Sequence, residues 1–222
     1  MSYKTENNGS WEKIYSEQGE VQHEILNTVV EAVRIFKDKK YHHILDLGCG
    51  TGRNTFYLAQ NGFQVTACDI SETGVNIAKK KADELGYKNI YFGIEDMYDL
   101  SYPDISFDAV LCVWTQGHGM RSDMQKSINE IHRILKPGGM TVTDFVTIED
   151  PTFGVGEKIA DNTFIGGRPG EENIPHYYTN EDDLKSMFRN FSFVSFIDRT
   201  YSFKDDNKIE HIIKAIVVQA VK

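Results

Sequence analysis

The sequence reads Asp46-Leu47-Gly48-Cys49-Gly50-Thr51-Gly52 where a short apolar run gives way to a helical pattern. Three alternate glycines let the backbone approach a ligand closely, and the start of the following helix offers free amide groups. A second carboxylate, Asp69, ends the next apolar run. A carboxylate at that place can accept hydrogen bonds from both hydroxyls of a ribose. Together these features predict a binding site for a ligand that contains a nucleoside.

The spacing and charge of this motif indicate which ligand it suits. A dinucleotide site uses G-x-G-x-x-G with a pyrophosphate at the helix start, whereas this motif reads G-x-G-x-G and begins with Asp46. A buried carboxylate next to a diphosphate is electrostatically unfavourable. S-adenosylmethionine has no phosphate and carries an ammonium and a sulfonium group, so the motif favours it. A Walker loop is excluded because no Gly-Lys-Ser/Thr follows.

Apolar runs and helical patterns alternate on both sides of the motif. The expected strands are 44–47, Gln64–Asp69, Ile90–Gly93, Phe107–Val113 and Thr141–Val146. The expected helices are Glu20–Phe36, Arg53–Asn61, Glu72–Leu85 and Arg121–Leu135. This alternation predicts an α/β fold, doubly wound, with a parallel sheet and helices on both faces.

The last part of the chain has a different pattern. A helix, Glu181–Phe188, leads to two strand-like segments, Phe191–Thr200 and Glu210–Val221. The polar connection between them is too short for a parallel crossover, so the last strand should be antiparallel to its neighbour. We therefore expect a single domain over residues 1–222, whose mostly parallel seven-stranded sheet has the order 3-2-1-4-5-7-6.

Composition restricts the partners and the compartment. The chain has 24 Lys and Arg against 33 Asp and Glu, a net charge of −9, which disfavours nucleic acid and anionic membranes. Three cysteines without C-x-x-C spacing argue against a disulfide framework and a structural zinc site. No signal peptide or membrane-spanning apolar stretch is evident. These features predict a cytoplasmic protein, a monomer or homodimer, with a small-molecule substrate and no metal.

From these residues the chain resembles the S-adenosylmethionine-dependent methyltransferases with a seven-stranded Rossmann-like fold, from about Trp11 to the C-terminus. The resemblance is most specific at Leu45–Gly52, Asp69, Asp96, Phe107–Cys112 and Leu135–Gly139. Trp11-Glu12-Lys13-Ile14-Tyr15 and Gly52-Arg53-Asn54 are similar to the small-molecule branch that includes thiopurine and tellurite-resistance type enzymes.

The resemblance implies a set of cofactor contacts. Asp46 would hold the ammonium group directly or through water, Asp69 the ribose, and Asp96 the adenine amino group. Arg53 is either a partner of the methionine carboxylate or a solvated side chain. The full set of expected cofactor residues is Asp46, Gly48, Cys49, Gly50, Gly52, Arg53, Asp69, Ile70, Asp96, Met97, Cys112 and Val113.

The methyl acceptor is left open by the sequence. After the fourth strand it reads Trp114-Thr115-Gln116-Gly117-His118-Gly119, where many relatives carry a histidine pair or a catalytic acid. His118 is a candidate base or substrate contact, and the alternative is a residue that begins a helix. The absence of Asn/Asp-Pro-Pro-aromatic at this place counts against methylation of nucleic-acid bases.

Two segments are expected to cover the site. Residues 1–36 form a helical lid or anchor, and the long connection over residues 147–179, without regular structure, caps the substrate. The substrate candidates in and around them are Trp11, Tyr15, Trp114, Arg168, His176 and Tyr177.

The function predicted from these residues is methyl transfer from S-adenosylmethionine to a small acceptor. A cofactor-binding module without catalysis remains an alternative, because a binding motif says nothing about turnover. An NAD-dependent oxidoreductase is a weaker alternative, because the motif begins with an aspartate and the last strand should be antiparallel.

Overall fold

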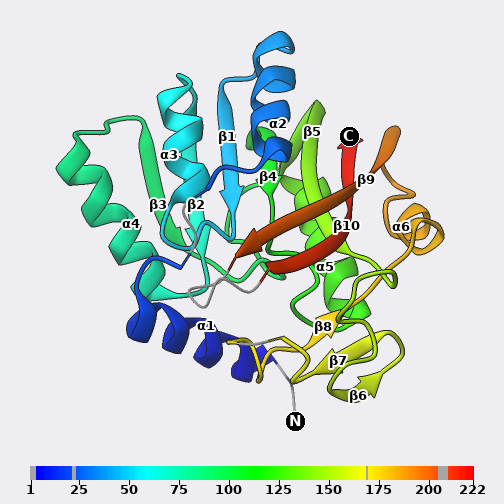
Figure 1. The fold of residues 1–222 in the computed structure, drawn as a ribbon. Helices are drawn as coiled ribbons and strands as arrows, with labels where there is room; N and C mark the ends of the chain where they lie inside the picture. The colour runs from blue at the N-terminus through cyan, green and yellow to red at the C-terminus, as the bar shows by residue number, and fades with distance from the viewer. Residues whose placement is uncertain (1–3, 22–23, 169, 205–209) are drawn as a thin grey trace.

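A seven-stranded sheet organises the computed structural model, which describes residues 4–21, 24–168, 170–204 and 210–222 (Figure 1). In spatial order the strands are β3 (Ile90–Ile94), β2 (Gln64–Asp69), β1 (His43–Leu47), β4 (Phe107–Cys112), β5 (Leu135–Val146), β10 (Glu210–Val221) and β9 (Phe193–Lys204). Strands β1 to β5 pair in parallel, and β10 is antiparallel to both of its neighbours. The predicted order and the antiparallel last strand are confirmed.

Helices cover both faces of the sheet. Helices α2 (Asn27–Asp38), α3 (Arg53–Gln60) and α4 (Glu72–Leu85) pack on one face, where Val33, Leu58 and Val75 belong to one buried cluster with side chains of the central strands. Helices α5 (Arg121–Ile134) and α6 (Glu181–Met187) pack on the other face through Ile128 and Leu184. This burial on both faces accounts for the continuous apolar runs of the central strands. No helix in the described part of the chain has the length and apolar character needed to cross a membrane.

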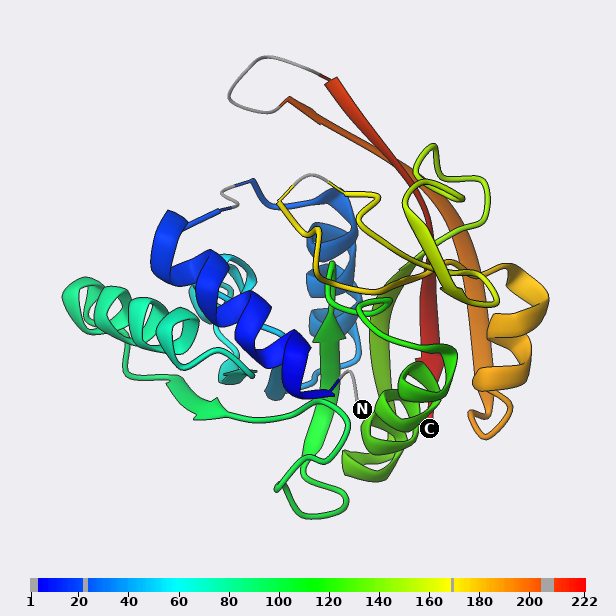
Figure 2. The same cartoon turned by 90° about the horizontal axis from the view of Figure 1, so that it is seen from below.

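The N-terminal region differs from the prediction. A separate helix, α1 (Lys4–Gln18), lies across the carboxyl ends of the parallel strands, and α2 begins only at Asn27 rather than at Glu20 (Figures 1 and 2). The sequence pattern suggested a helix from Glu20 because Val21 and Ile25 continue the four-residue apolar spacing of α2. Neither residue is helical: Val21 lines a cavity, and Ile25 packs on the core. The predicted lid or anchor of residues 1–36 is therefore divided between two elements. Helix α1 lies over the strand ends, and α2 packs on a face of the sheet.

The connection over residues 147–179 is also more regular than expected. It contains a small antiparallel sheet of β6 (Glu157–Ala160), β7 (Thr163–Ile165) and β8 (His176–Tyr177). Phe153, Phe164 and Tyr178 pack edge to face at its centre. The two ends of the segment lie side by side, since the Ile148 amide donates to the Thr179 carbonyl at 2.9 Å. The expectation that this segment lacks regular structure was wrong. Its strands pair with one another, and its packed aromatic rings give it a small core of its own.

Candidate active site

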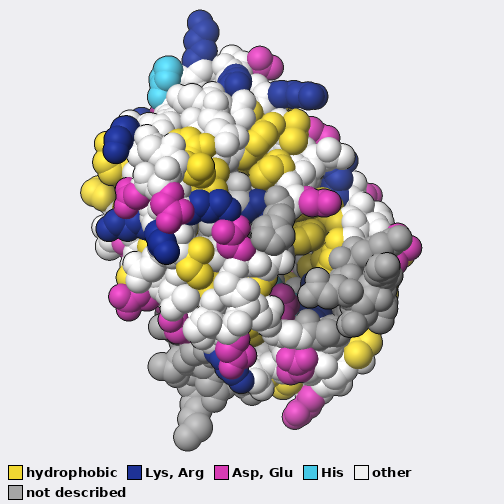
Figure 3. Space-filling view, turned by 60° about the vertical axis from the view of Figure 1, so that its left-hand side comes forward, with side chains coloured by type: hydrophobic (Ala, Val, Ile, Leu, Met, Phe, Trp, Pro, Cys, Tyr) yellow, Lys and Arg dark blue, Asp and Glu magenta, His cyan; other side chains and the backbone are white. Residues whose placement is uncertain are grey.

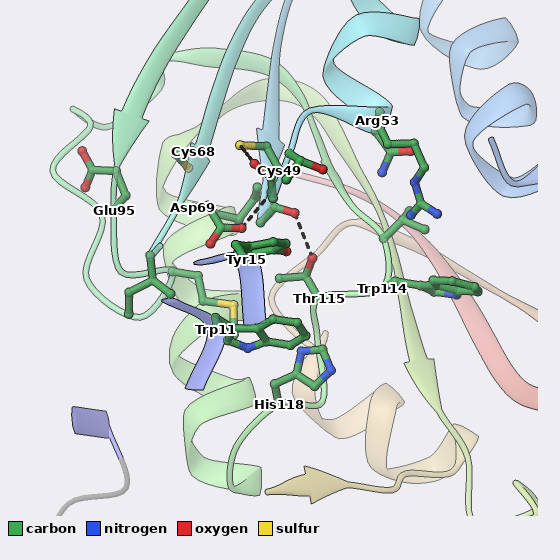
Figure 4. Close-up of a pocket in the computed structure, with 18 of the residues that line it drawn as sticks. Trp11, Tyr15, Cys49, Arg53, Cys68, Asp69, Glu95, Trp114, Thr115 and His118 are labelled. Atoms are coloured by element: carbon green, nitrogen blue, oxygen red, sulfur yellow. Dashed lines mark hydrogen bonds between the residues drawn. The ribbon is translucent and has the colours of Figure 1, made fainter. Parts of the chain in front are cut away.

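A cavity of about 950 Å³, open to solvent, lies at the carboxyl ends of β1, β2 and β4 (Figure 4). Its floor is the glycine-rich loop, whose Gly48 and Cys49 amides donate to the Cys68 carbonyl at 2.8 and 2.9 Å. Gly48 has φ +75°, and a Cβ on it would lie 2.2 Å from the Thr115 side chain. Glycine is therefore required there both by backbone conformation and by close packing.

Asp69 ties this loop to the next helix. One carboxylate oxygen accepts from the Gly50 amide at 2.8 Å, and the other accepts from the Ser71 amide at 3.0 Å. Burial raises the pKa of Asp69, and the hydrogen bonds from backbone amides oppose that rise. The side chain also lines the cavity, so the carboxylate is placed where the sequence predicted a ribose contact.

Three of the predicted cofactor residues do not line the cavity. Asp46 is buried behind the loop, where it accepts a hydrogen bond from the Thr55 hydroxyl at 2.5 Å, and burial raises its pKa to about 6. Gly52 precedes α3 with φ +93° and packs on Phe56. The Cys112 sulfur accepts from the Gln116 amide at 3.6 Å. Because Asp46 does not reach the cavity, its carboxylate can act on a ligand only through its electrostatic field or through groups that lie between them.

The remaining predicted cofactor residues come together around the cavity. They are Gly48, Cys49, Gly50, Arg53, Asp69, Ile70, Asp96, Met97 and Val113. Glu95, which the sequence analysis did not select, lines the cavity too, and its carboxylate also accepts from the Ser101 amide at 3.0 Å. Asp69, Glu95 and Asp96 give the lining three carboxylates against one cation, Arg53. This charge pattern suits a cationic nucleoside better than a diphosphate.

Helix α1 covers this cavity with two aromatic side chains. The rings of Trp11 and Tyr15 stack with centroids 5.9 Å apart, and Tyr15 lies against the glycine loop near Gly50 (Figure 4). Trp11 also contacts the His118 ring, at a centroid distance of 5.0 Å. Both aromatic side chains line the cavity, and their role as a lid stays a prediction.

Glu12 fastens α1 to the start of α4. Its carboxylate accepts from the Ser71 hydroxyl at 2.7 Å, from the Thr73 amide at 3.1 Å and from the Thr73 hydroxyl. These hydrogen bonds lower the pKa of Glu12. The carboxylate lies next to free amides at a helix N-terminus, where a negative charge is favoured. Sequence reasoning missed this contact, because it joins residues about sixty positions apart.

A second cavity, of about 1060 Å³, adjoins the first. Trp11, Trp114 and His118 line both. Trp114 lies two residues after the end of β4 and has φ +61°, and its backbone amide donates to an Asp144 carboxylate oxygen at 2.7 Å. A non-glycine residue in this region of backbone space is uncommon and typical of functional sites. The Arg53 guanidinium lies 5.2 Å from the Trp114 ring, at the border between the cavities.

The other substrate candidates are divided by the structure. Arg168 lines the second cavity, together with Glu171, a residue that the sequence analysis did not select. His176 is buried, and its Nε2 lies 2.6 Å from a Glu171 oxygen. Tyr177 lines neither cavity, and its hydroxyl donates to Asp183. Of the predicted substrate residues in the 147–179 segment, only Arg168 therefore faces the cavity directly.

His118 stands where the two cavities meet. Burial lowers its pKa to about 4, although Glu171 acts in the opposite direction. The imidazole is uncharged at neutral pH and can accept a proton from a group bound beside it. Its backbone is held by the Tyr98 hydroxyl, which donates to the His118 carbonyl at 2.9 Å.

The fold and the first cavity define a Rossmann-like nucleoside-binding domain. Residues 44–139 match a family model described as a methyltransferase domain. These residues therefore match a methyltransferase domain, and the sheet around them has the Rossmann-like order of the S-adenosylmethionine-dependent methyltransferases.

Curated relatives match over part of their length. The chain is 30% identical over 165 residues to the putative methyltransferase YqeM of Bacillus subtilis, covering 73% of this chain and 64% of that one. It is 28% identical over 158 residues to the tRNA N(3)-cytidine methyltransferase METTL2 of Danio rerio, covering 66% of this chain and 43% of that one. The chain thus spans less than two thirds of either relative.

Solved structures share the whole architecture. TehB from Haemophilus influenzae aligns with a TM-score of 0.68 at 20% identity, covering 96% of this chain and 67% of that one. The 1,6-didemethyltoxoflavin-N1-methyltransferase from Burkholderia thailandensis aligns with a TM-score of 0.69 at 18% identity, covering 99% of this chain and 88% of that one. At these identities the likeness establishes the fold.

Proposed function

We propose that this protein transfers a methyl group from S-adenosylmethionine to a small acceptor bound in the second cavity. The observation that carries the proposal is the arrangement of the two cavities, which adjoin at Trp11, Trp114 and His118. A donor in the first and an acceptor in the second would meet at this wall. The charge of the first cavity fits S-adenosylmethionine, and the glycine loop in its floor lets a ligand approach the backbone closely.

The chemistry asks little of the protein beyond positioning. Bound S-adenosylmethionine supplies a methyl group on a sulfonium. When the acceptor's electron pair forms a bond to the methyl carbon, the sulfur–methyl bond breaks and the sulfur leaves as a neutral thioether. Holding the reacting atoms in line contributes on the order of 7–11 kcal/mol in well-ordered systems. Where the acceptor must lose a proton, the uncharged His118 imidazole can take it.

The roles of the cofactor residues belong to this proposal. Asp69 accepts from the ribose hydroxyls, and Asp96 with Met97 and Ile70 surrounds the adenine. Gly48, Cys49, Gly50 and Val113 surround the methionine part, and the buried Asp46 acts from behind the loop. Support comes from the position of all but Asp46 in the cavity lining.

The covering segments complete the proposed site. Helix α1 closes over the donor through Trp11 and Tyr15, and the 147–179 segment caps the acceptor through Arg168 and Glu171. Three free, buried cysteines suit the reducing cytoplasm that we propose as its location.

A nucleic-acid acceptor is the principal rival, because one relative is named as a tRNA methyltransferase. The chain has a net charge of −9, and on the face in Figure 3 basic and acidic side chains are interspersed. This face offers no extended basic area to release counterions from a phosphate backbone. We therefore favour a small acceptor and no nucleic-acid or membrane partner, with a monomer or homodimer as the working form.

The experiment follows the methyl group. The protein is incubated with S-adenosylmethionine labelled in the methyl group and, separately, with the metabolite fraction and the RNA fraction of a cell extract. The proposal expects label in a small product of the metabolite reaction, and about tenfold less of it with Asp69→Asn at limiting S-adenosylmethionine. Label that enters RNA, or no transfer in either fraction, would contradict it.

A further inference from the structure

Two histidines and a glutamate meet at one wall of the second cavity. We call them the His118–Glu171–His176 cluster. Their ligand atoms, two imidazole nitrogens and a carboxylate oxygen, all lie within 4.8 Å of one another. Nε2 of His176 is 2.6 Å and Nε2 of His118 is 4.0 Å from the same Glu171 oxygen. The three side chains are 5%, 15% and 25% exposed for His176, His118 and Glu171.

The backbone holds the two histidines opposite each other. His118 and His176 form an antiparallel bridge, next to which the Tyr177 amide donates to the Gly117 carbonyl at 2.8 Å. Opposed residues in such a bridge bring their side chains to the same side, and the two rings lie 5.2 Å apart, edge to face. The pair is therefore positioned by main-chain contacts, and Glu171 reaches it from the segment that leads into β8.

We propose that the His118–Glu171–His176 cluster binds one divalent transition-metal ion, for which Zn²⁺ is the best suited. Bonds from zinc to nitrogen and oxygen are about 2.0–2.2 Å long, which puts neighbouring ligand atoms of a tetrahedral site roughly 3.3–3.6 Å apart. The observed separations of 2.6 and 4.0 Å lie on either side of that range. Small rotations of Glu171 and His118 bring all three atoms to bonding distance.

The donor set agrees with such an ion, although a cation lies near it. Two imidazoles and one carboxylate make up the protein ligands of several catalytic zinc sites, in which the fourth position stays open. Arg168 is the nearby cation, but its guanidinium lies 3.6 Å from the fully buried Asp150 carboxylate. Asp150 offsets only part of that charge, because Arg168 still acts on both His118 and Glu171, so an ion would bind beside a partly compensated cation.

An ion held by the cluster would lie beside the second cavity, because His118 and Glu171 line it. A hydroxyl or carboxylate oxygen of an acceptor could bind to the ion and be polarised by it. The ion would then take over from His118 the task of assisting proton loss from the acceptor, because His118 Nε2 would hold the metal. This consequence rests on the proposed function. Metal binding itself does not, and it is measured without S-adenosylmethionine, so the two can fail separately.

The test titrates the full, tag-free chain with Zn²⁺ by calorimetry and counts the metal per chain after dialysis. The proposal expects one ion per chain, with at least tenfold weaker binding for Glu171→Gln and His176→Gln. Glu172→Gln is the matched control, since Glu172 is adjacent and its carboxylate accepts from the Gly170 amide, away from the cluster. Circular dichroism establishes that each variant is folded.

Co²⁺ provides a second readout that reports the ligands directly. Bound at the cluster, it should give visible absorption bands typical of four or five nitrogen and oxygen ligands, and Glu171→Gln should abolish them even if His176→Gln does not fold. Wild-type protein that retains no ion, or variants that bind as tightly as wild type, would overturn the proposal. The same contacts would then be a hydrogen-bonded histidine–glutamate pair.

Discussion

Glu12 offers a way to loosen helix α1 without touching a cavity wall. Its carboxylate accepts three hydrogen bonds, two from Thr73 and one from Ser71, and it is not among the residues that line the first cavity. The change Glu12→Ala removes all three and leaves the propensity of α1 for helix intact, since alanine is the best helix former. We expect α1 to dissociate more readily from the start of α4.

The size of the effect follows from the kind of bond that is lost. A hydrogen bond to a charged group contributes about 1.5–3 kcal/mol when it is well shielded. The Glu12 carboxylate is close to solvent, which weakens its interactions, so we expect roughly 1.5 kcal/mol for the whole set. That free energy corresponds to about a tenfold shift in the docking equilibrium of α1.

Hydrogen exchange over residues 10–18 measures this shift, and exchange should be about tenfold faster in Glu12→Ala. The control is Glu17→Ala on the same helix, whose side chain is 60% exposed and pairs only with Lys13 among the described contacts. Because the pKa of Glu12 is lowered, its contribution is present above the ordinary value of 4.5 and is lost as the pH falls through the lowered one. Unchanged exchange in Glu12→Ala at neutral pH would show that Glu12 does not hold α1, and the reasoning would be wrong.

Three further predictions concern the loop and its carboxylates. Asp69→Asn should weaken S-adenosylmethionine binding by about 1.5 kcal/mol or more, measured by calorimetry, because a charged acceptor is lost; the exposed Asp83→Asn should bind as wild type. Gly48→Ala should lose binding because its Cβ would meet Thr115, whereas Gly62→Ala, at φ +90° with nothing within 4 Å, carries similar backbone strain and should still bind. Burial raises the pKa of Asp46 from 3.8 to about 6, so its contribution to the unfolding free energy is full below 3.8 and is lost as the pH rises through about 6. Urea unfolding of Asp46→Asn should therefore show a weaker fall of stability over that pH range, and an identical pH profile would contradict this.

Local patterns were enough to predict the sheet and most of the helices. Helix α4 was predicted with the correct ends, because Ser71 caps its start and Gly86 ends it with φ +77°. The antiparallel last strand followed from the short connection before Glu210. The glycine motif and Asp69 were enough to locate the first cavity, because they follow adjacent parallel strands whose carboxyl ends lie side by side.

Tertiary contacts account for what the sequence could not predict. The apolar positions Val21 and Ile25 continue a helical spacing, although each is buried by contacts outside a helix. Asp46 belongs to the motif, yet the Thr55 hydroxyl and its burial place it behind the loop. No pattern in the sequence pointed to Glu171. It joins a site only because the bridge between His176 of β8 and His118 brings its segment next to His118.

Calorimetry of the full chain with S-adenosylmethionine, S-adenosylhomocysteine and NAD tests the central claim most directly. The two S-adenosyl compounds should each bind with one site per chain and compete with each other, because both share the adenosine and methionine parts that the first cavity fits. NAD should give no binding heat, because its diphosphate would lie at the glycine loop in front of the Asp46 carboxylate, in a cavity whose lining has three carboxylates and one cation. Stoichiometric binding of NAD, with none of S-adenosylmethionine, would contradict the account.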